Sequence, residues 1–292
     1  MKPCALAAVL LCFALSARSG SAGDPHALTR QLARQLVEDG SFGAAAVEYR
    51  RLALSAEQPD HRAAYYWAAA YAYWRNGEPE RTAAMLDRAE QDSTRVSAES
   101  LLLRAESSLA ARKPDAATFY LRTLLAGPTP GLSTGFLRRR MAHATLRSTR
   151  SAAQAIEWLD AAPGLRDRAV ASLRSYASGR DKSPRLGGLL GIVPGLGYAY
   201  SGEFANALRS FILNGLFLFA MVDTAENDQW GAFAALSFFE LTWYSGSIYG
   251  GADAAHRYNR RRLDRCLEAV DEGAGFHPDL GALPLLTLRF ER

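Results

Sequence analysis

Two carboxylates lie in and beside an apolar stretch of the C-terminal half, where an acidic side chain could act in proton transfer or transport. Glu240 is the only charged residue in residues 229–252, and Asp253 follows directly. Because an ionisable group inside a membrane is costly, such a residue is a functional candidate for transport or acid–base catalysis. The structural alternative is that Glu240 pairs with Arg209 or hydrogen-bonds across a hairpin, and that Asp253 pairs with Arg257 one helical turn later.

Other patterns that carry chemistry are missing from the sequence. The five histidines have no metal-ligand spacing with another histidine, a cysteine or a carboxylate. There is no G-x-S-x-G turn, and the glycine-rich segment has neither GK[ST] nor the spacing of a phosphate loop. The net charge of +4 over 292 residues is too slight to indicate nucleic-acid binding. We therefore expect no enzyme, no cofactor, no metal and no small-molecule substrate, with a membrane enzyme using Glu240 or Asp253 as an alternative.

Five aromatic residues of one predicted helix are candidate protein-binding residues, because Tyr and Trp are common anchors at interfaces. They are Tyr66, Trp67, Tyr71, Tyr73 and Trp74. The alternative is that this helix lies in the middle of a stack and is buried on both sides, since such a helix is apolar nearly all round.

Helical hairpins in series are expected over residues 23–178. Gly and Pro break the chain near residues 40, 77, 114, 127–131 and 163–164, and the helices after the breaks start about 35 residues apart. This is the period of two-helix solenoid repeats, which must stack because one hairpin cannot cover its own apolar face. Small residues are predicted to let helices approach, each followed about one turn on by a larger residue. The small residues are Ala45, Ala83, Ala117 and Ala153, and the larger ones are Tyr49, Leu86, Leu121 and Trp158.

This half resembles the tetratricopeptide repeat family. The best match is Gly40, Phe42, Ala45 and Tyr49, which have the family's spacing of turn glycine, aromatic, small and aromatic residues. Weaker matches are Gly77 with Leu86 and Ala89, and Pro114 with Ala117 and Leu121. The resemblance covers about residues 25–178, and it departs at Thr82, where the family places a small alanine, and in the fourth unit, which lacks the turn glycine. It implies that a concave groove binds a peptide or protein.

The most specific string, I-V-P-G-L-G-Y-A-Y-S-G, occupies residues 192–202. It contains the motif residues Pro194, Gly195, Gly197, Tyr198, Tyr200 and Gly202. Residues 243–250 add Trp243, Tyr244, Gly246, Tyr249 and Gly250. Glycines at such positions permit tight turns and close contact between helices. Both strings resemble elements of small bacterial membrane modules found in envelope proteins, in which a Pro-Gly-x-Gly-x-x-Tyr-x-Gly entrance precedes a hydrophobic helical hairpin; the resemblance covers about residues 186–260.

Three apolar stretches follow the polar residues 179–185. The third, residues 229–252, is long enough for about 30 Å of hydrocarbon. The second, residues 210–222, is marginal, and the first, residues 186–202, is interrupted by proline and glycines, as in a re-entrant or interfacial turn. The small residues Gly246, Ser247, Gly250 and Gly251 would favour packing against other helices. The alternative is a soluble helical hairpin.

The N-terminal residues predict export. A positive start, an apolar run too short to span a bilayer and Gly20-Ser21-Ala22 make residues 1–22 a predicted signal peptide. The mature chain would keep Cys266 alone, so it could form no intramolecular disulfide. Basic residues on both sides of the apolar module would favour cytoplasmic ends, but large domains translocate regardless of loop charge, so we expect a periplasmic solenoid.

Together these observations predict an all-α protein. A solenoid of antiparallel, tetratricopeptide-like helical hairpins (residues 23–178) would be followed by a linker (179–185), a membrane-associated hydrophobic helical module (186–265) and a tail (266–292). We expect a non-enzymatic cell-envelope scaffold or adaptor that binds an unidentified protein partner through its repeats and contacts membrane lipid through the module. Two alternatives stay open: an accessory subunit of an integral-membrane insertion or export assembly, and a soluble periplasmic protein-binding module.

Overall fold

The computed structural model describes residues 26–92, 98–128, 131–160, 167–283 and 287–290. Thirteen helices hold 79% of these residues and two three-residue strands form the only sheet among them, which confirms the expected all-α fold. The predicted signal peptide and the predicted break at residues 163–164 lie outside the described residues. Contacts divide the chain into two units, residues 1–137 with 274–292 and residues 138–273, which are described separately.

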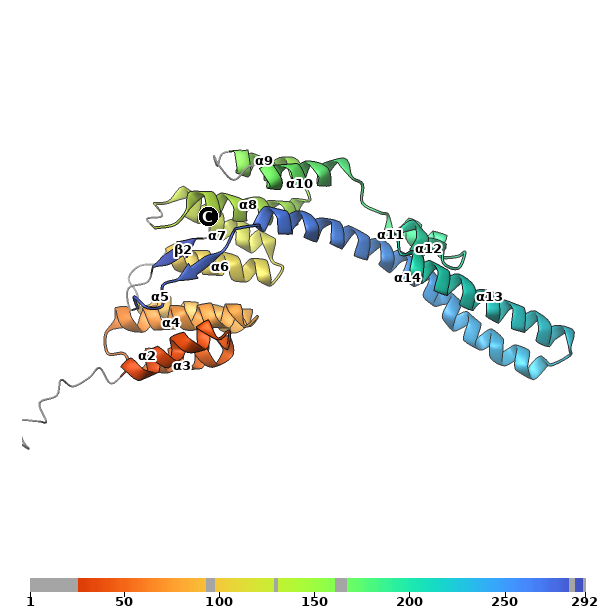
Figure 1. Ribbon diagram of the computed structural model, residues 1–292, viewed down its shortest axis with the longest axis horizontal. Coiled ribbons are helices and arrows are strands. Elements are labelled where there is room, and N and C mark those ends of the chain that lie inside the picture. Colours follow the sequence, from red (N-terminus) through yellow and green to blue (C-terminus); the bar gives the residue numbers. More distant parts are fainter. Residues whose placement is uncertain (1–25, 93–97, 129–130, 161–166, 284–286, 291–292) are drawn as a thin grey trace, which may run out of the picture. The chain divides into compact units, whose positions relative to one another are not determined.

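Unit 1 is a series of helices in which each packs against the next (Figure 1). The helices are α2 (Ala27–Glu38), α3 (Phe42–Ser55), α4 (Pro59–Arg75), α5 (Pro79–Asp92), α6 (Ala98–Ala110) and α7 (Pro114–Ala126), and α8 (Thr134–Thr149) begins at its end. Helices α3, α5 and α7, and α9 (Ala152–Asp160) in unit 2, start close to 35 residues apart, as the sequence predicts. Helices α2 to α9 are therefore repeat-like in their spacing.

Left-handed backbone positions mark the turns between paired helices. Gly40 and Gly77, the predicted turn glycines, have φ angles of +73° and +77°. Arg112 and Arg150 take the equivalent positions before α7 and α9, with φ angles of +57° and +59°. A side chain is strained at such angles, so the first two turns have the residue that the geometry favours and the last two do not.

The prediction of buried small residues is wrong for two of the four alanines. Ala45 and Ala117 are fully buried, but Ala83 and Ala153 are exposed. Thr82 takes the inner position in α5, four residues before the buried Leu86, so Ala83 points about 100° away around the helix. The hydroxyl of Thr82 donates to the Glu78 carbonyl at 2.9 Å, which satisfies it inside the core.

Unit 2 combines helical repeats with the apolar segment. Its further helices are α10 (Asp167–Ser178), α11 (Pro184–Leu190), α12 (Leu196–Tyr200), α13 (Phe204–Glu226) and α14 (Trp230–Asp271). The third apolar stretch and the basic stretch after it form one helix, α14, whose 42 residues extend about 63 Å. No proline interrupts α14, so the helix continues unbroken from its apolar part into its basic part.

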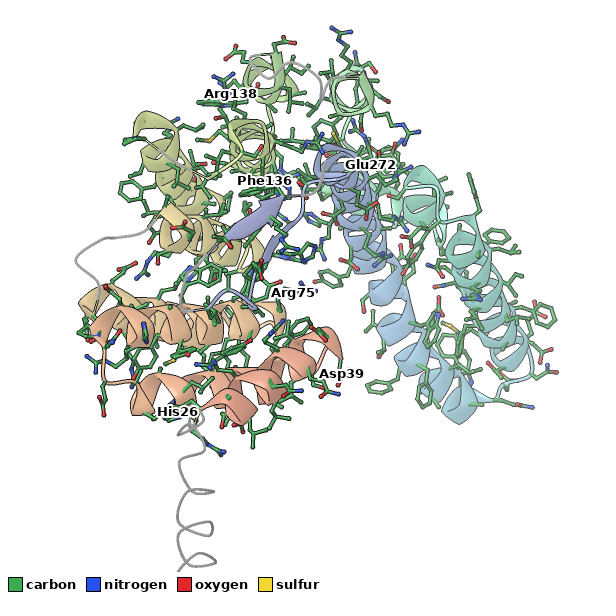
Figure 2. All side chains as sticks on the ribbon, turned by 60° about the vertical axis from the view of Figure 1, so that its left-hand side comes forward. His26, Asp39, Arg75, Phe136, Arg138 and Glu272 are labelled. Carbon is green, nitrogen blue, oxygen red and sulfur yellow. The ribbon has the colours of Figure 1, made fainter. Side chains whose placement is uncertain are left out.

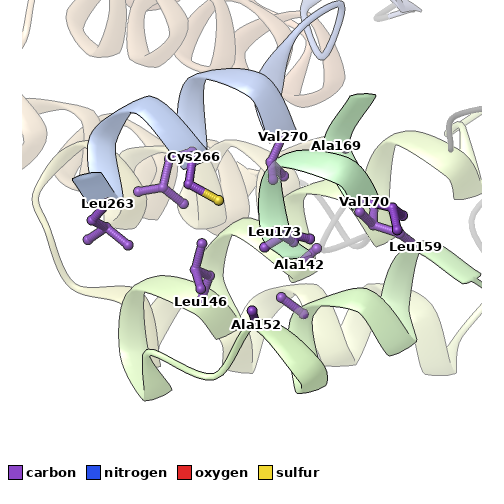
Figure 3. Close-up of a cluster of buried hydrophobic side chains, with 12 residues drawn as sticks. Ala142, Leu146, Ala152, Leu159, Ala169, Val170, Leu173, Leu263, Cys266 and Val270 are labelled. Carbon is purple, nitrogen blue, oxygen red and sulfur yellow. The ribbon is translucent and has the colours of Figure 1, made fainter. Parts of the chain in front are cut away.

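The end of α14 forms a core with α8, α9 and α10 (Figure 3). Leu263, Cys266 and Val270 of α14 are buried there with Leu146 and Leu173. Burial raises the pKa of the Cys266 thiol, which keeps it protonated and unreactive.

A carboxylate at the end of α14 adds a polar contact to this core. Asp271 accepts hydrogen bonds from Arg140 Nη1 at 2.6 Å and, through its other oxygen, contacts His143 Nδ1 at 2.8 Å. Burial alone would raise the pKa of Asp271, but the bond to His143 and the charge of Arg140 outweigh it and hold that pKa below its ordinary value.

Candidate functional site: an apolar hairpin and its glycine junction

Helices α13 and α14 form a hairpin whose outer surface is apolar. In Figure 2, side chains project outward from both helices. Phe219 of α13 is 73% exposed and Phe238 of α14 is 69% exposed. Other large apolar side chains share this exposure: Phe204, Leu208, Phe211, Leu216, Val222, Trp230, Phe239, Leu241 and Trp243. So extensive an apolar surface marks a site of interaction with a membrane or another protein.

One helix among the described residues, α13, is long and apolar enough to cross a membrane. Its 23 residues extend about 34 Å, and the hydrocarbon core of a bilayer is about 30 Å thick.

The interior of the hairpin is polar. Ser210 Oγ donates to Ser247 Oγ at 3.2 Å, and Asn214 Nδ2 donates to the Ser210 carbonyl at 2.6 Å. Asn214 is fully buried, Glu240 is 7% exposed, and Asn214 Oδ1 and Glu240 Oε2 have no hydrogen-bond partner among the described residues. The pairing of Glu240 with Arg209 that the sequence suggested is not observed among them. Polar groups inside and rings outside reverse the arrangement of a water-soluble protein.

The glycine-rich segment packs backbone to backbone against α14. A Cβ on Gly187 would lie 2.5 Å from the Gly251 carbonyl oxygen, and one on Gly191 would lie 2.6 Å from the Ser247 carbonyl oxygen. A Cβ on Gly197 would meet the Gly187 oxygen and lie 2.8 Å from Gly251 Cα. Because these neighbours are backbone atoms, they cannot rotate away, so α11, α12 and α14 can meet only through glycine. We name these residues, Gly187, Gly191, Gly197 and Gly251, the glycine junction.

The remaining motif glycines shape the turns around α12. Gly195 (φ +87°) and Gly202 (φ +79°) flank this helix in left-handed conformations, and a Cβ on Gly195 would also meet the Ala207 carbonyl oxygen. A Cβ on Gly250 would meet the Tyr198 hydroxyl, so the hydroxyl end of this ring lies against α14. The turn before Gly195 contains Pro194, which is half-buried.

Two motif tyrosines add hydrogen bonds to the junction. The Tyr244 hydroxyl donates to the Ile192 carbonyl at 2.7 Å, and the Tyr200 hydroxyl accepts from the Ser183 amide at 3.1 Å. Trp243, Gly246 and Tyr249 are exposed on α14 and take no part in it. The structure thus brings most of the two motifs together as one packing unit.

An ion network lies at the start of α13. Glu203 Oε2 accepts from Arg257 Nη2 at 2.7 Å and its Oε1 accepts from Arg261 Nη2 at 3.1 Å, while Arg257 also pairs with Asp253, as expected from their spacing. The bonds from Arg257 lower the pKa of Glu203 to about 2. Sequence reasoning missed Glu203 because its partners lie more than 50 residues away. Glu240 and Asp253 are 13 residues apart on one helix, about 20 Å, so they cannot act as a carboxylate pair.

Most of the aromatic residues predicted to bind a protein are buried in the core of unit 1. Tyr66, Trp67, Tyr71 and Tyr73 are each 6% exposed or less, between α3 and α5, and Trp74 is half-buried. This placement supports the alternative of a central helix buried on both sides. A partner could reach Trp74 without unfolding the array, but not the other four.

The C-terminal tail occupies the surface beside this helix. Strands β1 (Phe276–Pro278) and β2 (Leu288–Phe290) pair antiparallel within unit 1. The Phe276 ring is buried, stacks on Trp74 with 5.5 Å between ring centroids and meets Phe136 edge-on. The tail therefore covers part of Trp74, the most accessible member of the aromatic cluster, a contact that no local sequence pattern could reveal.

A scan of protein-family models found no match to this chain, and comparisons with curated proteins and with solved structures found none either.

Proposed function

We propose that this chain is a non-enzymatic scaffold of the bacterial cell envelope, with its C-terminal hairpin in a membrane and its repeats bound to a protein partner. The reversed polarity of the hairpin carries the proposal. Exposed rings such as Phe219 are costly in water, at about 25 cal/mol per Å² of apolar surface. In a bilayer the rings are solvated by lipid, and polar side chains such as Asn214 belong between the helices.

Helix α14 is less apolar than α13, but two polar residues of its apolar part, Glu240 and Ser247, face inward. Glu240 and Ser247 are buried, while Phe238, Phe239 and Leu241 are exposed. The pair can therefore insert together although α14 is the more polar of the two. The ion network of Glu203 and the acidic residues near the tip, such as Asp223 and Glu226, lie toward opposite ends of α13, in keeping with water at both ends.

Export is the second part of the proposal. The predicted signal peptide favours an array on the outer side of the membrane, whereas the basic flanks of the hairpin favour the cytoplasmic side. We give the signal peptide more weight, because large domains cross regardless of loop charge. If the hairpin lies in the interface without spanning, the two indications do not conflict.

The partner surface that the array offers is the apolar face of its first helical hairpin. Leu28 of α2 is 81% exposed and Leu54 of α3 is 65% exposed, with Leu32 and Val47 also exposed. Terminal repeats of a solenoid normally have a polar outer face, because nothing stacks on them. An apolar face at this place supports binding of a protein with complementary apolar side chains.

Site-specific photo-crosslinking in cells tests the adaptor proposal. A photoreactive residue at Leu28 or Leu54 should give one discrete adduct, and the adduct should weaken when the hairpin no longer enters the membrane. Arg81, whose side chain is 65% exposed on α5, is the control position and should give none. Absence of adducts at both leucines, or equal adducts at Arg81, would contradict the proposal.

A second candidate is an accessory subunit of an integral-membrane assembly. Gly215, Gly231 and Gly246 are exposed on the hairpin, and a Cβ on any of them would meet nothing within 4 Å. Exposed glycines permit close approach of another membrane helix. Crosslinks from Gly215 to a membrane protein, without crosslinks from Leu54, would favour this candidate.

A further inference from the structure

A pocket of about 510 Å³ lies along the base of the hairpin, and its lining changes from polar to apolar along its length. Asn206 and Arg257 lie toward the ion network, and Leu213 and Trp243 lie toward the tip. Asn206 and Leu213 are seven residues apart on α13, about 10 Å along its axis. A ligand that fits this pocket is therefore polar at one end and apolar at the other.

Arg209 lies between the two ends, and no described residue supplies it with a counterion. It is exposed on α13 in the wall of the pocket, and no carboxylate, carbonyl or aromatic ring among the described residues contacts its guanidinium. Arg257, by contrast, is neutralised by Glu203 and Asp253. The pocket therefore contains one cation that the described part of the chain leaves unpaired.

The direction of the Arg209 side chain suits a bilayer headgroup. Helical side chains lean toward the N-terminus of their helix, and the N-terminus of α13 is the end with the ion network. A long cationic side chain in a membrane helix extends in this way toward the headgroups. There it meets lipid phosphate, with which a guanidinium forms short, charge-assisted hydrogen bonds.

We propose that this pocket binds an anionic phospholipid, with the lipid phosphate on Arg209 and an acyl chain along Leu213 and Trp243. The proposal rests on insertion of the hairpin in a membrane. Phosphate chemistry alone would also suit a free anion, but the apolar end of the pocket favours a lipid. The lipid would hold the base of the hairpin at the level of the headgroups.

Lipid binding by the full-length protein tests this assignment. Native mass spectrometry in mild detergent would compare phosphatidylglycerol, phosphatidylcholine and inorganic phosphate. We expect a preference of about tenfold for phosphatidylglycerol, the scale of one charge-assisted contact, and loss of that preference in Arg209→Gln. Arg209→Lys should keep most of it. Arg260→Gln removes the same charge from an exposed position on α14 that does not line the pocket and should change nothing.

An unchanged preference in R209Q, an equal loss in R260Q, or displacement of the lipid by inorganic phosphate would overturn the proposal. If R209Q does not fold, a second measurement uses the wild type and phosphatidylglycerol with brominated acyl chains, which quench nearby tryptophans. The quenching should be stronger in the wild type than in Trp243→Phe, because Trp243 lies in the pocket. Equal quenching in the two proteins would overturn the proposal. Carbonate washing of membranes separates the two proposals. If the wild type washes off, membrane insertion fails; if it stays and R209Q keeps the preference, only the pocket assignment fails.

Discussion

Replacing Gly251 with alanine should loosen the glycine junction, whereas replacing Gly246 with alanine should not. The two glycines lie on the same helix, α14, one on its inner and one on its outer side. A Cβ at Gly251 would meet the Gly187 carbonyl oxygen and lie 3.0 Å from Gly197 Cα, whereas one at Gly246 would meet nothing within 4 Å. The pair thus separates the effect of packing from the effect of adding a methyl group.

The expected magnitude follows from two opposing effects. Alanine in a helix interior is about 1 kcal/mol more favourable than glycine, and this gain is common to both variants. An extra methyl group forced into a packed site costs about 1–3 kcal/mol. The free energy of unfolding should therefore be about 1–3 kcal/mol lower in Gly251→Ala than in Gly246→Ala. At about 2–4 °C per kcal/mol, the difference in Tm is measurable.

Thermal unfolding of both purified variants in one detergent is the assay. Limited proteolysis at residues 179–185, next to the junction, gives a local readout and should be faster in Gly251→Ala only. If Gly251→Ala were as stable as Gly246→Ala and equally protected, the backbone contacts would not hold the module together and this reasoning would be refuted.

Three further changes test other contacts. Glu203→Gln should lower the free energy of unfolding by up to about 3 kcal/mol at pH 7. Because the folded pKa of about 2 lies below the ordinary 4.5, the wild type should lose this stability as pH falls from 4.5 toward 2, so the difference between wild type and variant should shrink over that range, and parallel pH profiles would contradict it. Asp271→Asn should cost about 3 kcal/mol in chemical denaturation, since it removes the carboxylate that pairs with the buried Arg140, and an unchanged midpoint would contradict this. Phe276→Ala should cost about 3 kcal/mol and shift the emission of Trp74 to the red, and an unshifted spectrum would show that the tail does not cover that ring.

The helices and their turns were predictable because they depend on local residue types. Gly40 and Gly77 mark turns in the sequence and in the structure, because a left-handed position favours glycine. Which residue of each helix faces the core was harder to predict from the sequence. Ala83 was expected inside and Thr82 is there, because one residue rotates a helical position by about 100° and a satisfied hydroxyl can be buried.

The glycine motifs show where local reasoning ends. Their composition predicts close backbone contact, but it does not say which backbones meet. Gly251 was a candidate for contact with other helices, whereas in the structure it packs on Gly187 and Gly197 within the same module. Such pairs, like Phe276 with Trp74, join residues far apart in the chain, and only the folded register brings them together.

Insertion of the hairpin in a membrane is the central claim, and an alkaline carbonate wash of cell membranes tests it most directly. The wild-type chain should stay in the pellet. A variant with serine in place of the exposed Phe211, Leu216 and Phe219 should move to the supernatant, because it exposes too little apolar surface to remain in lipid. Release of the wild type into the wash would contradict the claim, since the hairpin would then be covered by protein and not by lipid.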